Sequence, residues 1–503
     1  MTGPKQTLVV VGAGPAGLTT ACAAQESGAW TVTVLEKDPV YVGGISRTVR
    51  YQGWRFDIGG HRFFSKSEEI NRWWKKRLPG EFIQVRRLSR ILYRRKFYDY
   101  PLRPMNALGN LGVWTSGLCG LSYAWARLRP VRSEVSFEDW VVNRFGRRLF
   151  EIFFRTYTEK VWGIPTHQIS ADWAAQRIKG LSLSRALIDA FRPRGKNRGE
   201  VVKTLIDTFA YPRFGPGQMW EKAADDVRAA QGRVLLDRGV TRIDHRNGRV
   251  IAVECTAPAG AVERYEGDAF VLSMPLRESV MALDPPAPAA IREAARQLSY
   301  RDFLTVALIV DGENPFPDNW IYIHDPDVLL GRIQNYRNWS EAMVAEDNAT
   351  CLGLEYFCFE GDGLWTMSDA ELVELGKAEL AQLNLIEPGR VREGVVVRME
   401  KAYPVYDAEY RSRVDTIREF LGTLTNLQVV GRNGMHRYNN QDHSMMTGLL
   451  AAKNLTARDF DLWRVNTDAE YHEEVRRGQE ATDPESGGRM VPRTIDRSVD
   501  RDR

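Results

Sequence analysis

The sequence contains few cysteines and few histidines. Its 503 residues include five cysteines, which lie far apart and form no CxxC pair, and seven histidines. Because a disulfide framework needs paired cysteines and a zinc site needs clustered ligands, we expect neither a disulfide framework nor a metal site. The scattered free cysteines favour a reducing compartment, and we expect a cytoplasmic protein.

The sequence also lacks an excess of charge of one sign. It has 69 Lys and Arg residues against 65 Asp and Glu residues, a net charge of +4, and 43% of its residues are apolar. This is the composition of a globular protein, and the charge balance gives no indication of a nucleic-acid partner. The sequence motifs of serine hydrolases, zinc proteases, P-loop enzymes and EF-hand proteins are missing as well.

A clear membrane-spanning segment is missing too. Residues 104–126 form an uncharged stretch of 23 residues, but four glycines and several polar side chains interrupt it. We expect a buried or groove-lining helical segment here rather than a span. The alternative of a helix that rests on a membrane surface stays open, because basic residues flank the stretch. The N-terminus runs straight into a strand-like segment, so no signal peptide is expected.

A local run of basic residues stands out against the balanced total. Between Arg72 and Arg103 the chain carries eleven basic and two acidic residues. Such a run is typical of a solvated face, and it can also attract an anionic substrate or an acidic membrane surface.

What the sequence does contain begins with a strand–helix–strand pattern. Residues 8–11 form a short apolar run typical of a buried parallel strand, residues 18–27 are rich in alanine and helix-like, and residues 30–36 alternate as a second strand. The pattern predicts a βαβ unit at the start of an α/β domain.

A glycine-rich turn joins the first strand to the helix. Gly12, Gly14 and Gly17 have the GxGxxG spacing of dinucleotide-binding domains. Gly12 permits the tight turn, Gly14 lets a pyrophosphate approach the backbone, and Gly17 lets helix and strand pack closely. Glu36, at the end of the second strand, can accept hydrogen bonds from both ribose hydroxyls and would repel a 2′-phosphate. The motif therefore predicts a dinucleotide site of the non-phosphorylated type.

Farther along, residues 68–78 and 137–157 are amphipathic and predict helices, and residues 90–100 predict a strand or hairpin. Ser136 and Asp139 form a plausible capping box at the start of the second helix. A helical insertion is therefore expected after the first nucleotide-binding unit, followed by a β-rich middle.

Further glycine motifs resemble those of the flavin amine oxidase superfamily. The pair Gly43-Gly44, the segment Phe56–His61 and the late turn Gly431–Gly434 stand where these flavoproteins approach their FAD. The resemblance implies FAD as the cofactor, bound by pieces of chain that long insertions separate.

Within this superfamily, the sequence resembles the UDP-galactopyranose mutases, and their eukaryotic branch in particular. The likeness is carried by Gly59-Gly60-His61, Tyr157–Pro165, Tyr211–Gly217 and Asn440–Ser444. It extends as islands over most of the chain to about residue 455. It implies a Rossmann-type FAD-binding domain of the α/β class, with a helical insertion and a mixed or antiparallel β-sheet substrate domain.

The resemblance also implies domain boundaries. We expect 1–66 as the first part of the FAD-binding domain, 67–200 as a mainly helical insertion at the substrate cleft, 201–285 as the second FAD-binding part, 286–424 as the β-sheet substrate domain, 425–463 as the third FAD-binding part, and 464–503 as a helical and then disordered tail.

The motif and the resemblance together give a set of expected cofactor contacts. The residues expected to bind FAD are Gly12, Gly14, Pro15, Ala16, Gly17, Glu36, Lys37, Gly43, Gly44, Arg47, Gly59, Gly60, His61, Gly431, Asp442, His443 and Ser444.

The resemblance also implies a set of substrate contacts. Their residue types suit a sugar diphosphate, because arginine neutralises phosphate through paired hydrogen bonds and aromatic rings stack on a base. The residues expected to bind substrate are Trp162, Arg177, Trp320, Arg332, Tyr403, Arg437 and Tyr438. Of all these residues, His61, Arg332 and Arg437 are expected to be catalytic. The alternative for each arginine is a surface or ion-pair role, and for each aromatic residue it is core packing.

The implied activity is the redox-neutral interconversion of pyranose and furanose forms of a nucleotide-linked sugar by reduced FAD, primed by an external reductant such as NAD(P)H. The alternative is an FAD-dependent oxidase or desaturase of the same superfamily, whose cleft would be apolar and would lack arginines. The partner in either case is a small molecule, and the oligomeric state stays open.

Overall fold

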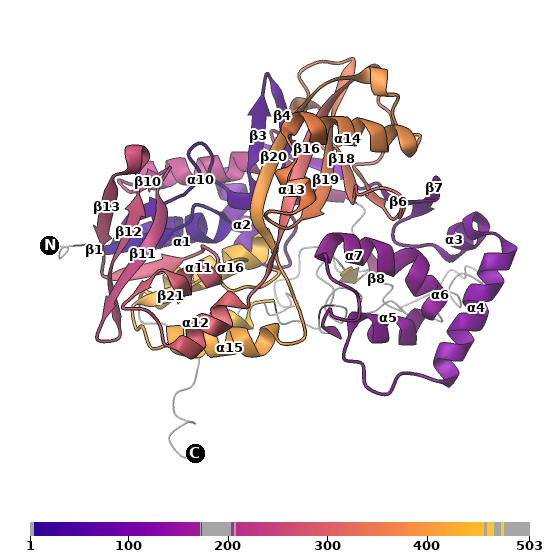
Figure 1. The fold of residues 1–503 in the computed structure, drawn as a ribbon. Coiled ribbons are helices and arrows are strands. Elements are labelled where there is room, and N and C mark those ends of the chain that lie inside the picture. The colour runs from indigo at the N-terminus through magenta and orange to yellow at the C-terminus, as the bar shows by residue number, and fades with distance from the viewer. Residues whose placement is uncertain are drawn as a thin grey trace.

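The structure is a computed structural model that describes residues 5–171, 173, 203–205, 208–456, 460–466 and 474–476. One part of the molecule is a layered α/β body, and the other combines a large sheet with a group of helices (Figure 1). The tail that we expect to be disordered, beyond residue 476, lies outside the described residues.

A parallel five-stranded sheet forms the middle of the α/β body, in the order β10–β2–β1–β14–β21. Its strands are β1 (Gln6–Val11), β2 (Trp30–Leu35), β10 (Arg233–Leu235), β14 (Ala269–Leu272) and β21 (Leu427–Val429). The central strands are almost continuously apolar because both faces of the sheet are covered. Three widely separated pieces of chain thus build one sheet.

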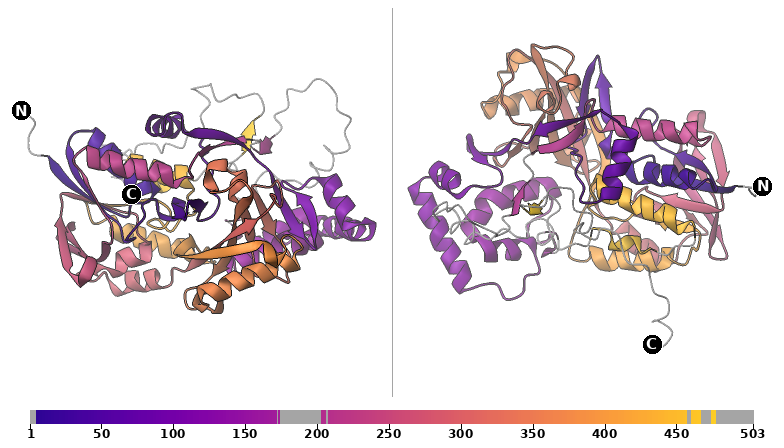
Figure 2. Two further views of the ribbon diagram at one scale, coloured as in Figure 1. Left: turned by 90° about the horizontal axis from the view of Figure 1, so that it is seen from above. Right: turned by 180° about the vertical axis from the view of Figure 1, so that it is seen from behind.

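Helices cover one face of this sheet and a smaller sheet covers the other. The first layer consists of α1 (Pro15–Glu26), α2 (Glu68–Arg77), α10 (Gly217–Ala229) and α16 (Gln441–Asn454). Helices α10, α1 and α16 lie side by side in the right view of Figure 2. The opposite layer consists of β11 (Gly239–Arg246), β12 (Arg249–Thr256), β13 (Val262–Glu266), β15 (Leu283–Asp284), α11 (Leu276–Met281), α12 (Ala289–Arg296) and α15 (Tyr410–Leu421).

The second part is built on a seven-stranded sheet in the order β20–β16–β19–β18–β17–β6–β7. Its strands are β6 (Ser89–Tyr93), β7 (Lys96–Asp99), β16 (Tyr300–Asp311), β17 (Trp320–Ile323), β18 (Arg332–Asn335), β19 (Ala349–Cys358) and β20 (Val391–Pro404). All neighbours are antiparallel except β17 and β6, so the sheet is mixed. The expected hairpin at residues 90–100 supplies β6 and β7, and these strands join the insertion to the seven-stranded sheet.

Short elements complete the described fold. The remaining strands are β3 (Thr48–Tyr51), β4 (Trp54–Asp57), β5 (Phe82–Arg86), β8 (Lys203–Leu205), β9 (Thr208–Pro212) and β22 (Glu474–Arg476). The remaining helices and helical turns outside the insertion are η1 (Gly44–Ser46), η3 (Pro258–Gly260), η4 (Tyr336–Asn338), η5 (Glu341–Met343), α13 (Gly363–Thr366), α14 (Asp369–Gln382), η6 (Pro388–Arg390) and η7 (Leu462–Arg464).

The insertion carries helices where the sequence predicted them, but one expected helix is broken. Its helices are α3 (Pro104–Leu111), α4 (Val113–Leu128), α5 (Phe137–Phe145), α6 (Arg147–Phe150), the π-helical η2 (Glu151–Arg155) and α7 (Thr156–Trp162). The capping box of Ser136 and Asp139 is confirmed. A single helix over 137–157 is wrong, because Gly146 adopts φ 82° between α5 and α6 and turns the chain.

The uncharged stretch 104–126 forms α3 and most of α4, separated by Gly112 at φ 81°. Among the described residues, no helix has both the length and the apolar character that crossing a membrane requires.

Glycine sets the distance between α1 and α16. A Cβ atom on Gly448 of α16 would lie 2.4 Å from the carbonyl oxygen of Ala16 in α1. A Cβ atom on Gly17 would lie 1.9 Å from the carbonyl oxygen of Gly12. Since real Cβ atoms do not approach oxygen so closely, only glycine lets the start of α1 pack between the β1 turn and α16.

We therefore expect Gly448→Ala to destabilise the protein by about 1–3 kcal/mol through overpacking. The matched control is Gly117→Ala in α4, where a Cβ would meet nothing within 4 Å and where alanine should stabilise the helix by about 0.5–1 kcal/mol. Thermal unfolding followed by circular dichroism measures both. Equal midpoints for the two variants would contradict the proposed close contact.

Candidate active site

The first residues of α1 and α16 line one pocket. Gly14 is the N-cap of α1 and Asn440 is the N-cap of α16. The free N–H groups of a helix N-terminus and the positive end of its dipole favour an anion. Two such ends at one pocket, from segments more than 400 residues apart, suit a diphosphate.

Two glycine turns meet at the wall of this pocket. A Cβ on Gly14 would meet nothing within 4 Å, whereas a Cβ on Gly44 would lie 3.6 Å from the Cα of Gly14. The N–H of Gly43 donates to the carbonyl of Ala13 at 2.8 Å, and Gly43 has φ 100°. The second glycine pair is thereby held against the first turn, and the open space beside Gly14 lets a ligand approach the backbone.

Glu36 lies behind the glycine turn at the end of β2. Its carboxylate accepts hydrogen bonds from the N–H of Ala13 at 2.6 Å and from the N–H of Asp38 at 3.0 Å. Burial raises the pKa of Glu36 above its ordinary value, and the two N–H donors oppose that rise. The carboxylate therefore fixes the loop on which the motif places a ribose.

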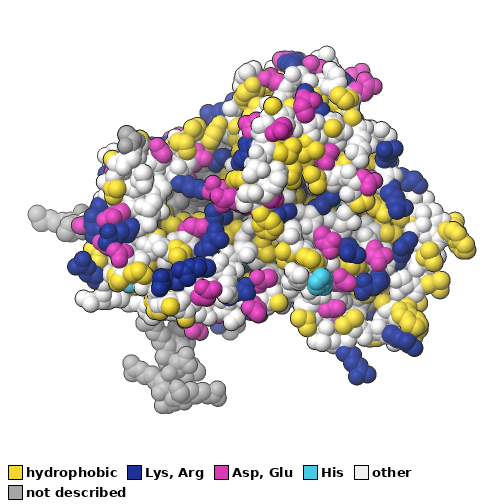
Figure 3. Space-filling model, viewed as in Figure 1, with side chains coloured by type: hydrophobic (Ala, Val, Ile, Leu, Met, Phe, Trp, Pro, Cys, Tyr) yellow, Lys and Arg dark blue, Asp and Glu magenta, His cyan; other side chains and the backbone are white. Residues whose placement is uncertain are grey.

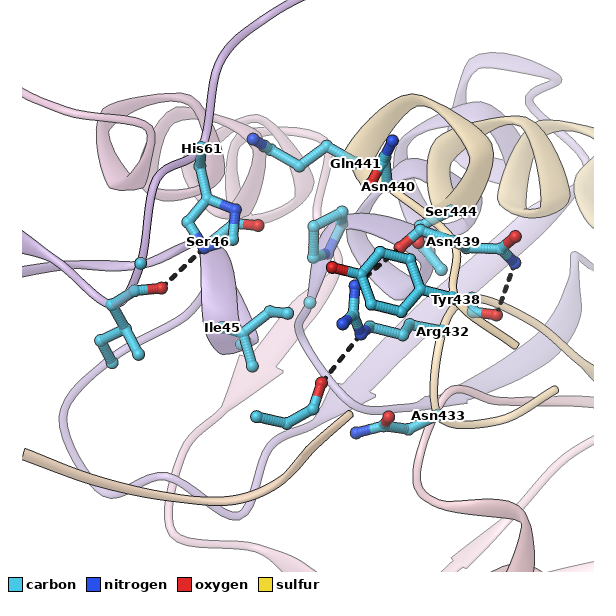
Figure 4. A pocket seen from close by; sticks show the side chains of 18 of the residues that line it. Ile45, Ser46, His61, Arg432, Asn433, Tyr438, Asn439, Asn440, Gln441 and Ser444 are labelled. Carbon is cyan, nitrogen blue, oxygen red and sulfur yellow. Dashed lines mark hydrogen bonds between the residues drawn. The ribbon is translucent and has the colours of Figure 1, made fainter. Parts of the chain in front are cut away.

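An unpaired amide shows that the pocket suits a polar ligand. Gln441 is 8% exposed, and neither its Oε1 nor its Nε2 has a hydrogen-bond partner among the described residues. Figure 4 shows its side chain extending from the start of α16 over the pocket. A buried amide without hydrogen-bond partners costs folding free energy, and a polar ligand bound here would supply the missing hydrogen bonds. The residues present thus fit the diphosphate and polar edges of FAD.

His61 lies in the loop after β4, at the opposite wall. Its Nε2 donates to the carbonyl of Ile58 at 2.7 Å (Figure 4). Burial lowers the pKa of His61 to about 4, helped by the nearby charges of Arg432 and Arg332. The imidazole is therefore neutral at pH 7 and carries its proton on Nε2.

Arg332 on β18 lies beside this loop. A Cβ on Gly59 would be 3.8 Å from both the Nη2 of Arg332 and the Nε2 of His61. The guanidinium donates to the fully buried carboxylate of Glu355 on β19, with Nε at 2.5 Å from Oε2. Burial alone would lower the pKa of Arg332, but Glu355 raises it well above the ordinary value. Glu355 also accepts from Gln334 at 2.8 Å, so this cation is held rigidly.

A second cation lies against two tyrosine rings. The guanidinium carbon of Arg432 is 4.0 Å from the ring centroid of Tyr438 and 4.7 Å from that of Tyr403. Figure 4 shows Arg432 lying along the ring of Tyr438. Its Nε donates to Ala402 O at 2.8 Å, and no ion pair with a carboxylate joins it among the described residues. Its charge is therefore available to an anion.

Most of the expected residues meet at this pocket. Those that line it are Gly14, Pro15, Ala16, Gly44, Gly59, Gly60, His61, Arg332, Tyr403, Gly431, Tyr438, Asp442 and Ser444. Those that support its wall are Gly12, Gly17, Glu36, Gly43 and His443. Lys37 instead pairs with Glu400 at the surface, and Arg47 pairs with Asp38.

The structure does not bring every expected substrate residue to the pocket. Arg437 donates to the carbonyl of Trp463 at 2.5 Å and does not line the pocket. Trp162 and Trp320 are 1% and 4% exposed and pack in aromatic clusters behind the wall, which is the alternative role stated above for such residues. Arg177 lies outside the described residues.

Sequence reasoning missed Arg432, Gln441 and Arg62, all of which line the pocket. Arg432 and Gln441 lie inside motifs that carry the family resemblance, at Gly431–Gly434 and Asn440–Ser444. Their positions directly after Gly431 and Asn440, inside those motifs, were thus the available signal. Arg62 directly follows His61 and had no comparable marker.

We expect Glu36→Lys to weaken FAD binding about 10- to 150-fold, because charged hydrogen bonds worth about 1.5–3 kcal/mol are lost. The exposed neighbour provides the control, since Lys37→Gln should leave FAD affinity unchanged. Equilibrium dialysis of the apoprotein with FAD measures the effect. Equal affinities for the two variants would show that Glu36 does not contribute.

We expect His61→Ala to keep its FAD but to shift the flavin midpoint potential by about 20 mV, the equivalent of one hydrogen bond of about 1 kcal/mol. His167→Ala, at an exposed position, is the control. Spectroelectrochemistry measures both potentials. Identical potentials in the two variants would leave His61 a purely structural role.

Comparisons with known proteins agree with this geometry. A family model described as flavin containing amine oxidoreductase matches residues 15–431. The fold is similar to a crystal structure of reduced UDP-galactopyranose mutase, with a TM-score of 0.75 and 21% identity over 90% of this chain and 96% of that chain. It is also similar to putrescine oxidase bound to putrescine, with a TM-score of 0.59 and 18% identity over 90% of this chain and 100% of that chain.

A third similar structure is an oxidoreductase from Methanosarcina mazei, with a TM-score of 0.58 and 13% identity over 90% of this chain and 100% of that chain. At these identities the three structures show the fold alone. The family model covers most of the sequence, and the pocket offers the turns, helix ends and unpaired polar groups that a flavin dinucleotide requires. The chain therefore belongs to the family of flavin-containing amine oxidoreductases, and its cofactor is FAD.

Proposed function

We propose that this protein is an FAD-dependent mutase that interconverts the pyranose and furanose forms of a nucleotide-linked sugar without net oxidation. The observation that carries the proposal is the cationic wall of the pocket. Arg332 and Arg432 both line it, and they lie next to His61 and the tyrosine pair Tyr403–Tyr438.

The position of Arg432 favours an anion over an amine. A cationic amine would seek the faces of Tyr403 and Tyr438, but the guanidinium of Arg432 already lies 4–5 Å from both ring centroids. A second positive charge there would be repelled. A diphosphate would instead gain charge-assisted hydrogen bonds from the same group.

Arg332 would act by holding the leaving diphosphate near the reacting carbon. Because Glu355 and Gln334 fix its guanidinium, little rearrangement is needed when negative charge develops, which is the condition for electrostatic catalysis. Neutral His61 donates its Nε2 proton to the Ile58 carbonyl, which holds the imidazole in place at the pocket wall.

In its reduced form, bound FAD would supply the electron-rich group that reacts with the sugar. An external reductant of the NAD(P)H class would have to reduce it once, after which each turnover leaves its redox state unchanged. The anomeric carbon–oxygen bond breaks and re-forms, and the ring closes through a different hydroxyl, so substrate and product have the same composition.

A second candidate function is an FAD-dependent oxidase or desaturase. Phe303 and the two tyrosines give the pocket an aromatic side, which favours an apolar or amine substrate. An apolar or amine substrate, however, would have no negative charge to pair with the two arginines at the wall.

We expect Arg332→Gln to weaken binding of UDP to the FAD-loaded protein about 10- to 150-fold, because one charge-assisted contact worth about 1.5–3 kcal/mol is lost. Glutamine retains a donor for Glu355, which limits the disturbance of the buried pair. Changes in the flavin absorption spectrum on titration with UDP give the affinity.

The matched control is Arg437→Gln, because Arg437 does not line the pocket. The affinity of the Arg437→Gln variant for UDP should equal that of the unmodified protein. Undiminished binding in Arg332→Gln, or absence of UDP binding to any form, would contradict the mutase proposal while leaving FAD binding intact.

A further inference from the structure

Helix α4 exposes a stripe of large apolar side chains at the end of the insertion. The exposed fractions are 87% for Trp114, 50% for Leu118, 71% for Leu121, 59% for Trp125 and 79% for Leu128. These positions follow one another at intervals of four and three residues, so they share one side of the helix. We call these five residues the outer face of α4.

The opposite side of α4 shows that this orientation is fixed by packing. Cys119 and Ala126 are 4% and 5% exposed and face inward. A Cβ on Gly146 would lie 2.7 Å from the backbone nitrogen of Tyr123, so the helix backbone rests directly on the α5–α6 turn. Small side chains thus pack inward and large apolar ones point to solvent, which is the reverse of an ordinary surface helix.

Basic residues flank the outer face along the chain. No Asp or Glu occurs between residues 100 and 133, while Arg127, Arg129 and Arg132 are exposed. The turn of the neighbouring β6–β7 hairpin adds exposed Arg94, Arg95 and Lys96, and Lys96 donates to Asn110 O of α3 at 2.9 Å. In Figure 3 this right-hand end of the molecule shows yellow and dark blue side chains and little magenta.

We propose that the outer face of α4 docks the protein on a bilayer surface that contains anionic lipids. The helix would lie in the plane of the interface, with two tryptophans and three leucines among the upper acyl chains and the arginines at the headgroups. An apolar stripe with tryptophan and flanking basic residues is the pattern of interfacial helices, and anionic lipid strengthens their binding.

Charge distinguishes this occupant from a second copy of the chain. In a two-fold symmetric contact the same patch meets itself. The arginines at the end of α4 would then face a surface that offers no carboxylate between residues 100 and 133, and like charges at an interface are unfavourable. Anionic headgroups supply the missing negative charge.

Flotation of the FAD-loaded, full-length protein with lipid vesicles tests the proposal. The vesicles are phosphatidylcholine mixed with phosphatidylglycerol, or phosphatidylcholine alone. The variants are Trp114→Ser/Leu121→Ser on the outer face and Arg127→Gln/Arg129→Gln at its basic end. The control is Val262→Ser, which removes an apolar side chain that is 70% exposed on β13.

The unmodified protein should float with the mixed vesicles and bind at least about tenfold less to phosphatidylcholine alone. Both double variants should lose binding to the mixed vesicles at least about tenfold. For Arg127→Gln/Arg129→Gln the reason is that each arginine removed lowers the affinity about fivefold. Val262→Ser should bind like the unmodified protein. Retained FAD absorption confirms that the variants are folded.

Three results would overturn the proposal. The first is no flotation of the unmodified protein with the mixed vesicles. The second is a loss of binding in the Val262→Ser control equal to that in the double variants. The third is a lipid-free dimer in sedimentation velocity that Trp114→Ser/Leu121→Ser converts to a monomer, which would show that a second copy covers the outer face of α4.

Discussion

The structure depends on the close approach of two helix N-termini, those of α1 and α16, to one turn. The approach is possible because Gly17 and Gly448 carry no Cβ, and a methyl group on either would lie within 2.4 Å of a backbone oxygen. Helices from opposite ends of the chain therefore present free N–H groups to the same pocket. The seven-stranded sheet and the helical insertion lie to one side of this contact (Figure 1).

The side of the pocket that carries Arg332 and Arg432 is organised by charged side chains. Arg332 is held by Glu355, whose carboxylate is fully buried, and the pair is shared between neighbouring strands β18 and β19. Arg432 has no such carboxylate among the described residues and is held by ring faces and backbone carbonyls instead. One cation is thus held rigidly by a carboxylate while it still lines the pocket, and the other has no carboxylate partner among the described residues. This difference is the physical basis for expecting an anionic substrate.

Much of the cofactor side could be predicted from sequence, because glycine spacing and strand–helix order reflect local backbone requirements. The role assigned to Gly17, close packing of helix and strand, is seen directly in its contact with Gly12 O. The substrate side could be predicted less well. Arg432 and Arg437 lie in an irregular turn closed by the bond from Arg437 N to Arg432 O, so no periodicity shows which one points into the pocket. The core position of Trp320 likewise depends on which face of its strand is covered, and the break at Gly146 depends on what packs against that turn. Distant parts of the chain decide both.

The central claim is that the pocket performs redox-neutral chemistry on an anionic sugar nucleotide. The most direct measurement is anaerobic incubation of the dithionite-reduced protein with UDP-galactose and other nucleotide sugars, with chromatography of the products and the flavin spectrum recorded before and after. We expect a furanose isomer of at least one nucleotide sugar, formed over many turnovers while the flavin stays reduced. Absence of any isomer, together with rapid oxygen-dependent formation of hydrogen peroxide from an amine, would contradict it.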